Sequence, residues 1–125
     1  MANIRNALQY DSNSKRETQL RKGCLELAVL ASLWDGRLYG LEILERLEAG
    51  PQLIVSEGTI YPLLGRLKAE GLLDSEWIES GGGHPRKYYR LTAVGREQTL
   101  AMARLWSAFS TKVASLLGPL LNKGA

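Results

Sequence analysis

Apolar residues recur at helical spacing in the first half of the chain. One broad apolar stripe runs over residues 15–34, and a second, in three-residue steps, runs over residues 39–49. We expect Asp35-Gly36 to end the first helix and Gly50-Pro51 to end the second, because proline cannot continue the backbone bonding of a helix. The first stripe consists of Leu20, Cys24, Leu27, Val29, Leu30, Leu33 and Trp34, and the second of Leu41, Leu44 and Leu47.

A third helix is predicted to begin at Ser56, whose hydroxyl can accept a hydrogen bond from a free N–H of the first turn. Gly71 is expected to end this helix. Pro62 lies beyond the first turn and forfeits one backbone hydrogen bond, so we expect a tightened or slightly bent start. The core stripe consists of Ile60, Leu63, Leu64 and Leu67.

The next segments change from helical to alternating spacing. Residues 72–79 and 86–91 are predicted to be two strands joined by a glycine-rich turn at 80–84. Thr92 then caps a last helix that is expected to run to about Leu117, where Gly118-Pro119 stops it. The order predicts a mainly α fold with a small β-hairpin: a winged helix-turn-helix plus a long C-terminal helix.

This order divides the chain into four parts. Residues 1–14 are polar and non-periodic and are expected to form a flexible N-terminal arm. Residues 15–91 form the winged helix-turn-helix domain, residues 92–121 a C-terminal dimerisation helix, and residues 122–125 a tail.

The last helix is too long for the domain that carries it. Some twenty residues at about 1.5 Å each span roughly 30–40 Å, whereas a domain of about 100 residues has a radius of gyration near 13 Å. An exposed apolar stripe on such a helix is an association site, so we expect a homodimer. The alternative is a helix folded back on its own core. The stripe has coiled-coil spacing and consists of Met102, Leu105, Trp106, Phe109, Val113, Leu116, Leu117 and Leu120.

Composition narrows the class of protein. With 125 residues, 45% hydrophobic and 23% charged, the chain has room for one domain and one modest core. Its single cysteine, Cys24, excludes an intramolecular disulfide framework and a multi-cysteine zinc site. There is no segment like a signal peptide and no apolar run of bilayer length, so a cytosolic protein without a membrane partner is expected.

The net charge of +3 is mild, but the charges occur in blocks. Four cations against one acid lie in residues 15–22, and four cations without an acid lie in residues 86–96. Blocks of this kind favour a polyanionic partner on one face. Two solvated basic surfaces are the alternative reading.

The outward face of the third helix carries small residues: Gly58, Pro62, Gly65 and Ala69. Such a face lets the helix backbone approach a partner closely, as an α-helix does in the major groove of DNA. Packing against another helix is the alternative explanation. The flanking side chains that would reach outward are Thr59, Tyr61, Arg66 and Lys68.

The segment SGGGHPRKYYRLT, residues 80–92, fits the tip of a wing. Its glycines allow a tight turn and close approach, and its cations attract phosphate whatever the base sequence. Strand alternation puts Lys87, Tyr89 and Leu91 on the core side. The expected DNA contacts of the wing are His84, Arg86 and Lys87. Lys87 shares the inward side, but the pleat loosens near the tip, so its side chain can still reach solvent.

The same segment is not a P-loop, because its glycines lead into a strand and Lys87 is not followed by Ser or Thr. His84 and Cys24 lie in different predicted elements and match no catalytic motif. One histidine and scattered carboxylates do not form a metal site. We expect no enzymatic activity, no metal and no cofactor.

Four segments together resemble the PadR family of bacterial transcriptional regulators: KGCLELAVLASL, LYGLEILERL, SEGTIYPLLGRLKAEGLL and HPRKYYRLTAVG. The resemblance covers about residues 21–117. The single C-terminal helix is similar to that of the smaller subtype of the family.

The resemblance implies a dimeric winged-helix repressor of a pseudo-palindromic operator in double-stranded DNA. It places DNA contacts on the third helix, at Ser56, Gly58, Thr59, Tyr61, Arg66 and Lys68, on the wing at His84, Arg86 and Lys87, and at the helix starts at Lys22 and Tyr39. Some family members bind flat effectors on a tryptophan of the C-terminal helix, which matches Trp106. The neighbours that are aromatic or acidic in those sensors are Ala103 and Ser110 here, and Trp106 also has the spacing of a dimer core residue.

A winged-helix module that binds only protein remains the alternative function. Such a module is expected to have an acidic or apolar third-helix face, which this sequence lacks.

Overall fold

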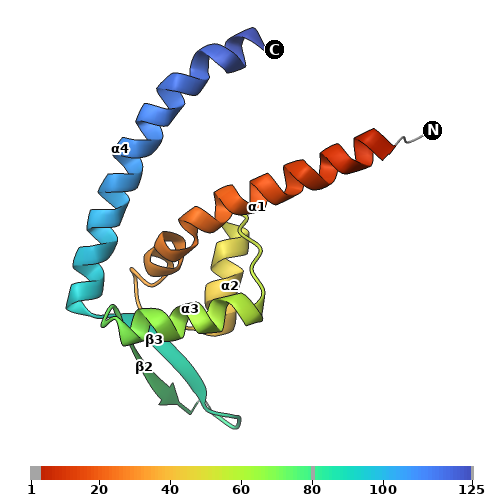
Figure 1. Cartoon of the computed structure of the whole chain (residues 1–125). Helices are drawn as coiled ribbons and strands as arrows, with labels where there is room; N and C mark the ends of the chain where they lie inside the picture. The colour runs from red at the N-terminus through yellow and green to blue at the C-terminus, as the bar shows by residue number, and fades with distance from the viewer. Residues whose placement is uncertain (1–3, 80, 125) are drawn as a thin grey trace.

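The computed structural model describes residues 4–79 and 81–124, with side chains described from Lys15 onward (Figure 1). The described residues form four helices and a small three-stranded antiparallel sheet, so the predicted winged helix-turn-helix with a long C-terminal helix is confirmed. The elements are α1 (Ile4–Ser32), β1 (Leu38–Tyr39), α2 (Gly40–Ala49), α3 (Glu57–Ala69), β2 (Leu73–Ile78), β3 (Arg86–Leu91) and α4 (Ala93–Lys123).

The first helix begins earlier than the hydrophobic pattern predicts. Helix α1 starts at Ile4, so the prediction of a helix start near Lys15 is wrong. Residues 4–14 contain neither Gly nor Pro, and extending an existing helix is far easier than nucleating one. Hydrophobic periodicity misses this segment because its apolar residues are few. Residues 1–3 of the expected arm lie outside the described residues, and its flexibility stays a prediction.

The last helix also runs past its predicted end. Pro119 lies inside α4, which continues to Lys123, so Gly118-Pro119 does not stop it. Of the tail expected at 122–125, residues 122 and 123 are therefore helical, and residue 125 lies outside the described part. Proline removes one donor from a helix, and on an exposed turn water can bond the carbonyl left without a partner.

Two caps were predicted, and they differ in their chemistry. Thr92 caps α4 as expected, since its Oγ1 accepts from the N–H of Gly95 at 2.9 Å. Ser56 occupies the N-cap position of α3, but its side chain makes no capping bond. Its hydroxyl instead lies 3.1 Å from Oγ1 of Thr59. The position of the helix start was predicted correctly, and the hydrogen bond was not.

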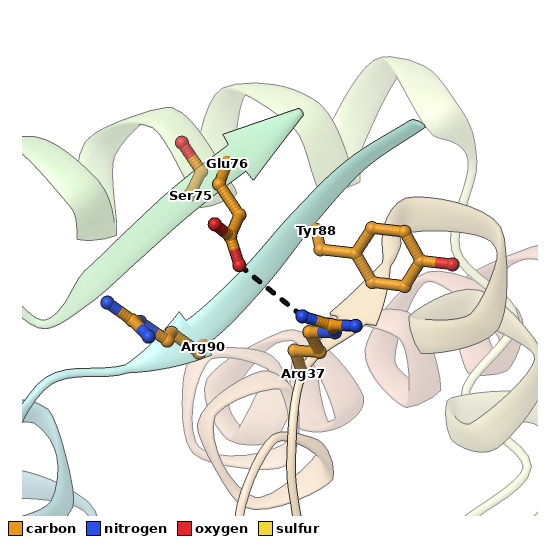
Figure 2. Close-up of a pocket in the computed structure, with 5 residues that line it drawn as sticks. All are labelled: Arg37, Ser75, Glu76, Tyr88 and Arg90. Atoms are coloured by element: carbon orange, nitrogen blue, oxygen red, sulfur yellow. Dashed lines mark hydrogen bonds and ion pairs between the residues drawn. The ribbon is translucent and has the colours of Figure 1, made fainter. Parts of the chain in front are cut away.

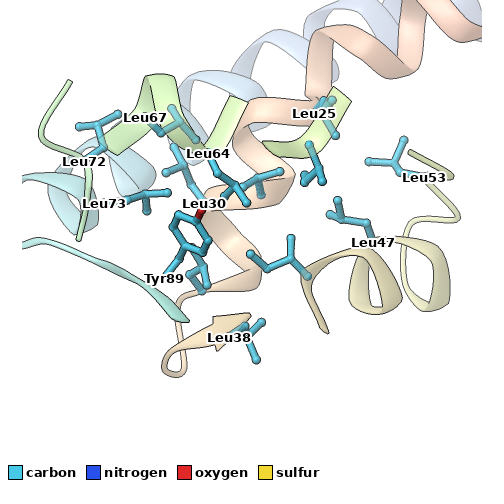
Figure 3. Close-up of a cluster of buried hydrophobic side chains, with 14 residues drawn as sticks. Leu25, Leu30, Leu38, Leu47, Leu53, Leu64, Leu67, Leu72, Leu73 and Tyr89 are labelled. Carbon is cyan, nitrogen blue, oxygen red and sulfur yellow. The ribbon is translucent and has the colours of Figure 1, made fainter. Parts of the chain in front are cut away.

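The core lies between α1, α2, α3 and the inner side of the hairpin (Figure 3). The predicted stripe of α3 is confirmed: Ile60, Leu64 and Leu67 are buried, and Leu63 is half-buried. Helix α4 contributes only its start, where Met102 packs against the core. The buried apolar set is Leu25, Val29, Leu30, Leu33, Leu38, Ile43, Leu47, Leu53, Ile60, Leu64, Leu67, Leu72, Leu73 and Tyr89.

The sheet has the strand order β1-β3-β2, with β3 in the middle. Strands β2 and β3 form the wing, in a register that pairs Leu73 with Leu91 and Trp77 with Lys87. Tyr89 is buried, which confirms that it points to the core. Gly82 in the turn between these strands has a φ of +87°, a conformation that favours glycine.

The start of α4 is fixed tightly to the chain after α3. Oγ1 of Thr92 donates to the carbonyl of Gly71 at 2.7 Å. Gly95 lies so close to the carbonyl oxygen of Leu72 that no Cβ could fit between them. Past this anchor α4 leaves the core, and in Figure 1 it and the N-terminal half of α1 both extend well beyond the compact domain.

Candidate nucleic-acid interface

The small-residue ridge of α3 faces open space. Gly58, Pro62, Gly65 and Ala69 are all exposed. A Cβ added at Gly65 would have no atom within 4 Å outside its own turn, and one added at Gly58 would meet only the Ser56 hydroxyl at 3.8 Å. Within the described chain, therefore, the ridge does not pack against another helix, which was the alternative reading of this pattern.

Tyr61 flanks the ridge and is 43% exposed. Its ring lies against the backbone of Gly40 at the start of α2, where a Cβ on Gly40 would be 2.5 Å from the phenol oxygen. Burial raises the pKa of Tyr89 above its ordinary value, and the neighbouring Tyr61 raises it further. Tyr61 thus lies at the junction of α2, α3 and β3 and remains partly exposed. Thr59 and Lys68, on either side of the ridge, are exposed.

Arg66 is held differently from the other flanking residues. Its guanidinium lies 3.0 Å from the carboxylate of Glu70 and 3.7 Å from that of Glu26 on α1. These two partners draw it back toward α1 and offset its charge. Sequence reasoning missed this pairing because Glu26 is distant in the chain from Arg66.

The structure brings two expected DNA contacts of separate segments together. The guanidinium of Arg86, on the wing, lies 4.5 Å from the ring centroid of Tyr39, at the start of α2. The Tyr39 and Tyr88 rings meet edge to face at 5.4 Å, and the two residues pair directly across β1 and β3. Arg86 is exposed and has no acidic partner within 4 Å in the described part of the chain.

Lys87, by contrast, is half-buried on the inner side of the wing. Its ammonium lies 5.9 Å from the ring centroid of Trp77 and 5.7 Å from that of Tyr89. Trp77 is 67% exposed and was not among the expected site residues. The strand register of the hairpin places Trp77 directly opposite Lys87.

The outer side of the wing carries a set of polar side chains around a small pocket (Figure 2). Arg37 lies 3.4 Å from Glu76 and stacks 5.3 Å from the ring centroid of Tyr88, while Arg90 lies 3.8 Å from Asp74. The pocket holds about 20 Å³, enough for one water. These two ion pairs neutralise the charges on the outer side of the wing away from its tip. Among the described wing residues, the cations without an acidic partner therefore lie near the tip.

Two expected contacts stand apart from this group. Lys22 is exposed on α1, and no hydrogen bond or ion pair joins it to α3 or the wing among the described residues. His84 is exposed in the loop between β2 and β3, two residues before Arg86 in the chain.

The apolar stripe of α4 is largely uncovered. Leu105, Leu116 and Leu120 are more than 60% exposed, and Trp106 is 48% exposed. An open groove of about 1220 Å³ separates the stripe from α1. Its walls are mostly apolar and include Leu20, Cys24, Leu27, Leu53, Met102, Leu105, Trp106, Phe109, Val113 and Leu117.

Residues 4–79 and 81–124 contain no cluster of three metal-ligating side chains. In the same part of the chain, no helix has the length and apolar character needed to cross a bilayer.

Known proteins resemble this chain in both sequence and fold. A family model described as "Transcriptional regulator PadR-like family" matches residues 29–101. A PadR family transcriptional regulator from Eggerthella lenta is 36% identical, with a TM-score of 0.77 over 88% of this chain and 96% of that chain. A PadR-like regulator from Bacillus cereus is 38% identical, with a TM-score of 0.72 over 79% and 96% of the two chains. A Mycobacterium tuberculosis transcriptional regulator is 35% identical over 78 residues, which are 62% of this chain and 71% of that protein.

Proposed function

The chain belongs to the PadR-like family of transcriptional regulators, and we propose that it is a sequence-specific repressor that binds a pseudo-palindromic operator as a homodimer. The observation that carries the proposal is the exposed small-residue ridge of α3 beside a wing with uncompensated cations. A helix with such a ridge can seat deeply in the major groove, where base edges are read.

In this proposal the contacts divide by role. Thr59 and Tyr61 project from α3 toward base edges, and Lys68 toward phosphate. Arg86 and His84 attract the backbone beside the groove, with Tyr39 supporting the Arg86 guanidinium at 4.5 Å. Arg66 attracts DNA less strongly than an unpaired arginine on α3 would, because Glu70 and Glu26 already pair with it.

The second copy is proposed to cover the α4 stripe. Large exposed apolar patches mark association surfaces, and the stripe combines coiled-coil spacing with an open groove alongside. A two-fold dimer presents two copies of α3, and its symmetry calls for an operator with two inverted half-sites.

The proposal also includes repression and its release. A bound dimer would block the promoter on which it sits. Trp106 lines the groove with Phe109 and Leu105, so a flat apolar molecule could stack there and alter the relative position of the two copies. Packing of the dimer alone is the other role that the spacing of Trp106 allows.

The test is a footprint of the protein on the DNA upstream of its own gene, with quantitative binding at several salt concentrations. A protected inverted repeat, and a log affinity that falls linearly with log salt, are expected. Equal affinity for the promoter and for random duplex would contradict sequence-specific repression. No binding to either would favour a protein-interaction module.

A further inference from the structure

The inner side of the wing becomes more exposed toward the tip of the hairpin. On β2, Leu73 is 1% exposed and Ser75 is half-buried, but Trp77 on the same side is 67% exposed. Helix α3 packs against β2, and Figure 1 shows the hairpin continuing past it. Trp77 therefore lies on the side of the wing that faces α3, just beyond the part that α3 covers.

Lys87 gives this exposed ring a fixed positive neighbour. The Lys87 ammonium lies within 6 Å of the ring centroids of both Trp77 and Tyr89, the range of cation–π attraction. No acidic side chain of the described residues pairs with it. The ammonium is thus positioned by aromatic rings while its charge stays available to an anion.

These residues lie close to Tyr61, one of the proposed DNA contacts of α3. Tyr61 on α3 neighbours Tyr89, and Lys87 and Trp77 follow along the inner side of the wing. When a helix occupies the major groove and a hairpin lies beside it, the sugar-phosphate strand that borders the groove passes through the corner between them. Trp77 and Lys87 lie on the inner side of the wing, which faces that corner.

We propose that Trp77 is a direct DNA contact: its indole packs on a deoxyribose of the bordering strand while Lys87 pairs with the adjacent phosphate. This inference rests on the proposed DNA binding. The contact reads no base, so it should raise affinity for every sequence and fix the position of the wing.

The first experiment compares Trp77→Ala and Trp77→Phe, each in the native chain and with Lys87→Ala, by quantitative binding to operator and random duplex. Trp77→Ala is expected to weaken both by about five- to tenfold, as loss of an aromatic contact does, and Trp77→Phe to retain most of the affinity. Lys87→Ala should lower the salt slope by about one, while Trp77→Ala should leave it unchanged. Trp77→Ala should also weaken binding in the Lys87→Ala background.

Two results would overturn the inference. One is native affinity for Trp77→Ala. The other is loss of its effect in the Lys87→Ala background, since that would make Trp77 only a positioning residue for Lys87. Thermal unfolding of Trp77→Ala serves as the control, and little change is expected for a side chain this exposed.

A second experiment keeps Trp77 and so does not depend on how its variants fold. With Trp34→Phe and Trp106→Phe, Trp77 becomes the single tryptophan of the chain. Its emission is expected to be quenched or shifted to the blue when duplex is added, because the exposed indole becomes covered. Duplex binding with unchanged emission contradicts the contact and leaves the proposed function intact, whereas absence of duplex binding by the native protein removes both.

Discussion

The phenol of Tyr61 occupies the space that a side chain on Gly40 would need. A Cβ at Gly40 would lie 2.5 Å from the Tyr61 hydroxyl and 2.7 Å from its Cε1. The glycine at the start of α2 therefore lets an α3 side chain rest against the α2 backbone. Its ring can still move, since 43% of Tyr61 is exposed.

Gly40→Ala is expected to displace Tyr61 without unfolding the domain. The added methyl must push the flexible ring outward, while the buried residues of α2, Ile43 and Leu47, keep their places. We expect discrimination between operator and random duplex to fall by about tenfold, in line with about 1–3 kcal/mol per base contact. Competition binding measures it. Tyr61→Ala should reproduce the loss, and full discrimination in Gly40→Ala would show that the Tyr61 position is not used for reading.

The ridge of α3 makes a second prediction, in which stability and binding change in opposite directions. Gly65→Ala adds a methyl in open space and replaces a poor helix former, so it should stabilise the fold by about 0.5–1 kcal/mol. In the proposed complex the same methyl would stand between α3 and the floor of the DNA major groove, so it should weaken DNA binding severalfold. Thermal unfolding and duplex titration measure the two effects.

Gly118→Ala is the control for the effect of Gly65→Ala on DNA binding. Gly118 is also inside a helix, a Cβ there would meet no atom within 4 Å, and it does not line the α1–α4 groove. It should leave DNA binding unchanged, and its gain in stability should be smaller, because Pro119 disfavours the helical conformation of a preceding residue that has a Cβ. Tighter binding by Gly65→Ala would contradict close approach of the α3 backbone.

Gly65 and Arg66 are neighbours on α3, but only the environment of Gly65 could be predicted from the sequence. Periodicity predicted the core stripe and the outward ridge of α3, because both follow from the geometry of one helix. The pairing of Arg66 with Glu26 depends on how α1 crosses α3, which no local pattern specifies. Trp77 was missed for a related reason: its exposure depends on where α3 stops covering the hairpin.

The helix ends show the same division between local and tertiary causes. Thr92 and Gly71 were predicted correctly because a cap and a positive φ are local requirements. The start of α1 at Ile4 and the passage of α4 through Pro119 were not predicted, because both segments lie outside the core that creates a periodic signal.

Arg86 and Arg90 lie on the same side of β3 and test the wing charge. Arg90 pairs with Asp74 at 3.8 Å, whereas Arg86 has no acidic partner among the described residues. Arg86→Ala is expected to weaken operator and random duplex alike and to lower the salt slope by about one. Arg90→Ala should leave both nearly unchanged. Equal effects of the two substitutions would mean that net charge, and not the position of Arg86, accounts for binding.

The proposed dimer can be tested with two exposed apolar residues of α4. Phe109 lines the α1–α4 groove and is 59% exposed, while Leu100 is 41% exposed and lies outside it. Phe109→Glu would bury a carboxylate without a partner in an apolar interface, which strongly disfavours association. Light scattering at micromolar concentration should find a dimer for the native chain and for Leu100→Glu, and a monomer for Phe109→Glu. The monomer should also bind an inverted repeat more weakly, with affinity close to that for a single half-site, because each α3 then binds without its partner. A native chain that is monomeric at this concentration would contradict the role assigned to the α4 stripe.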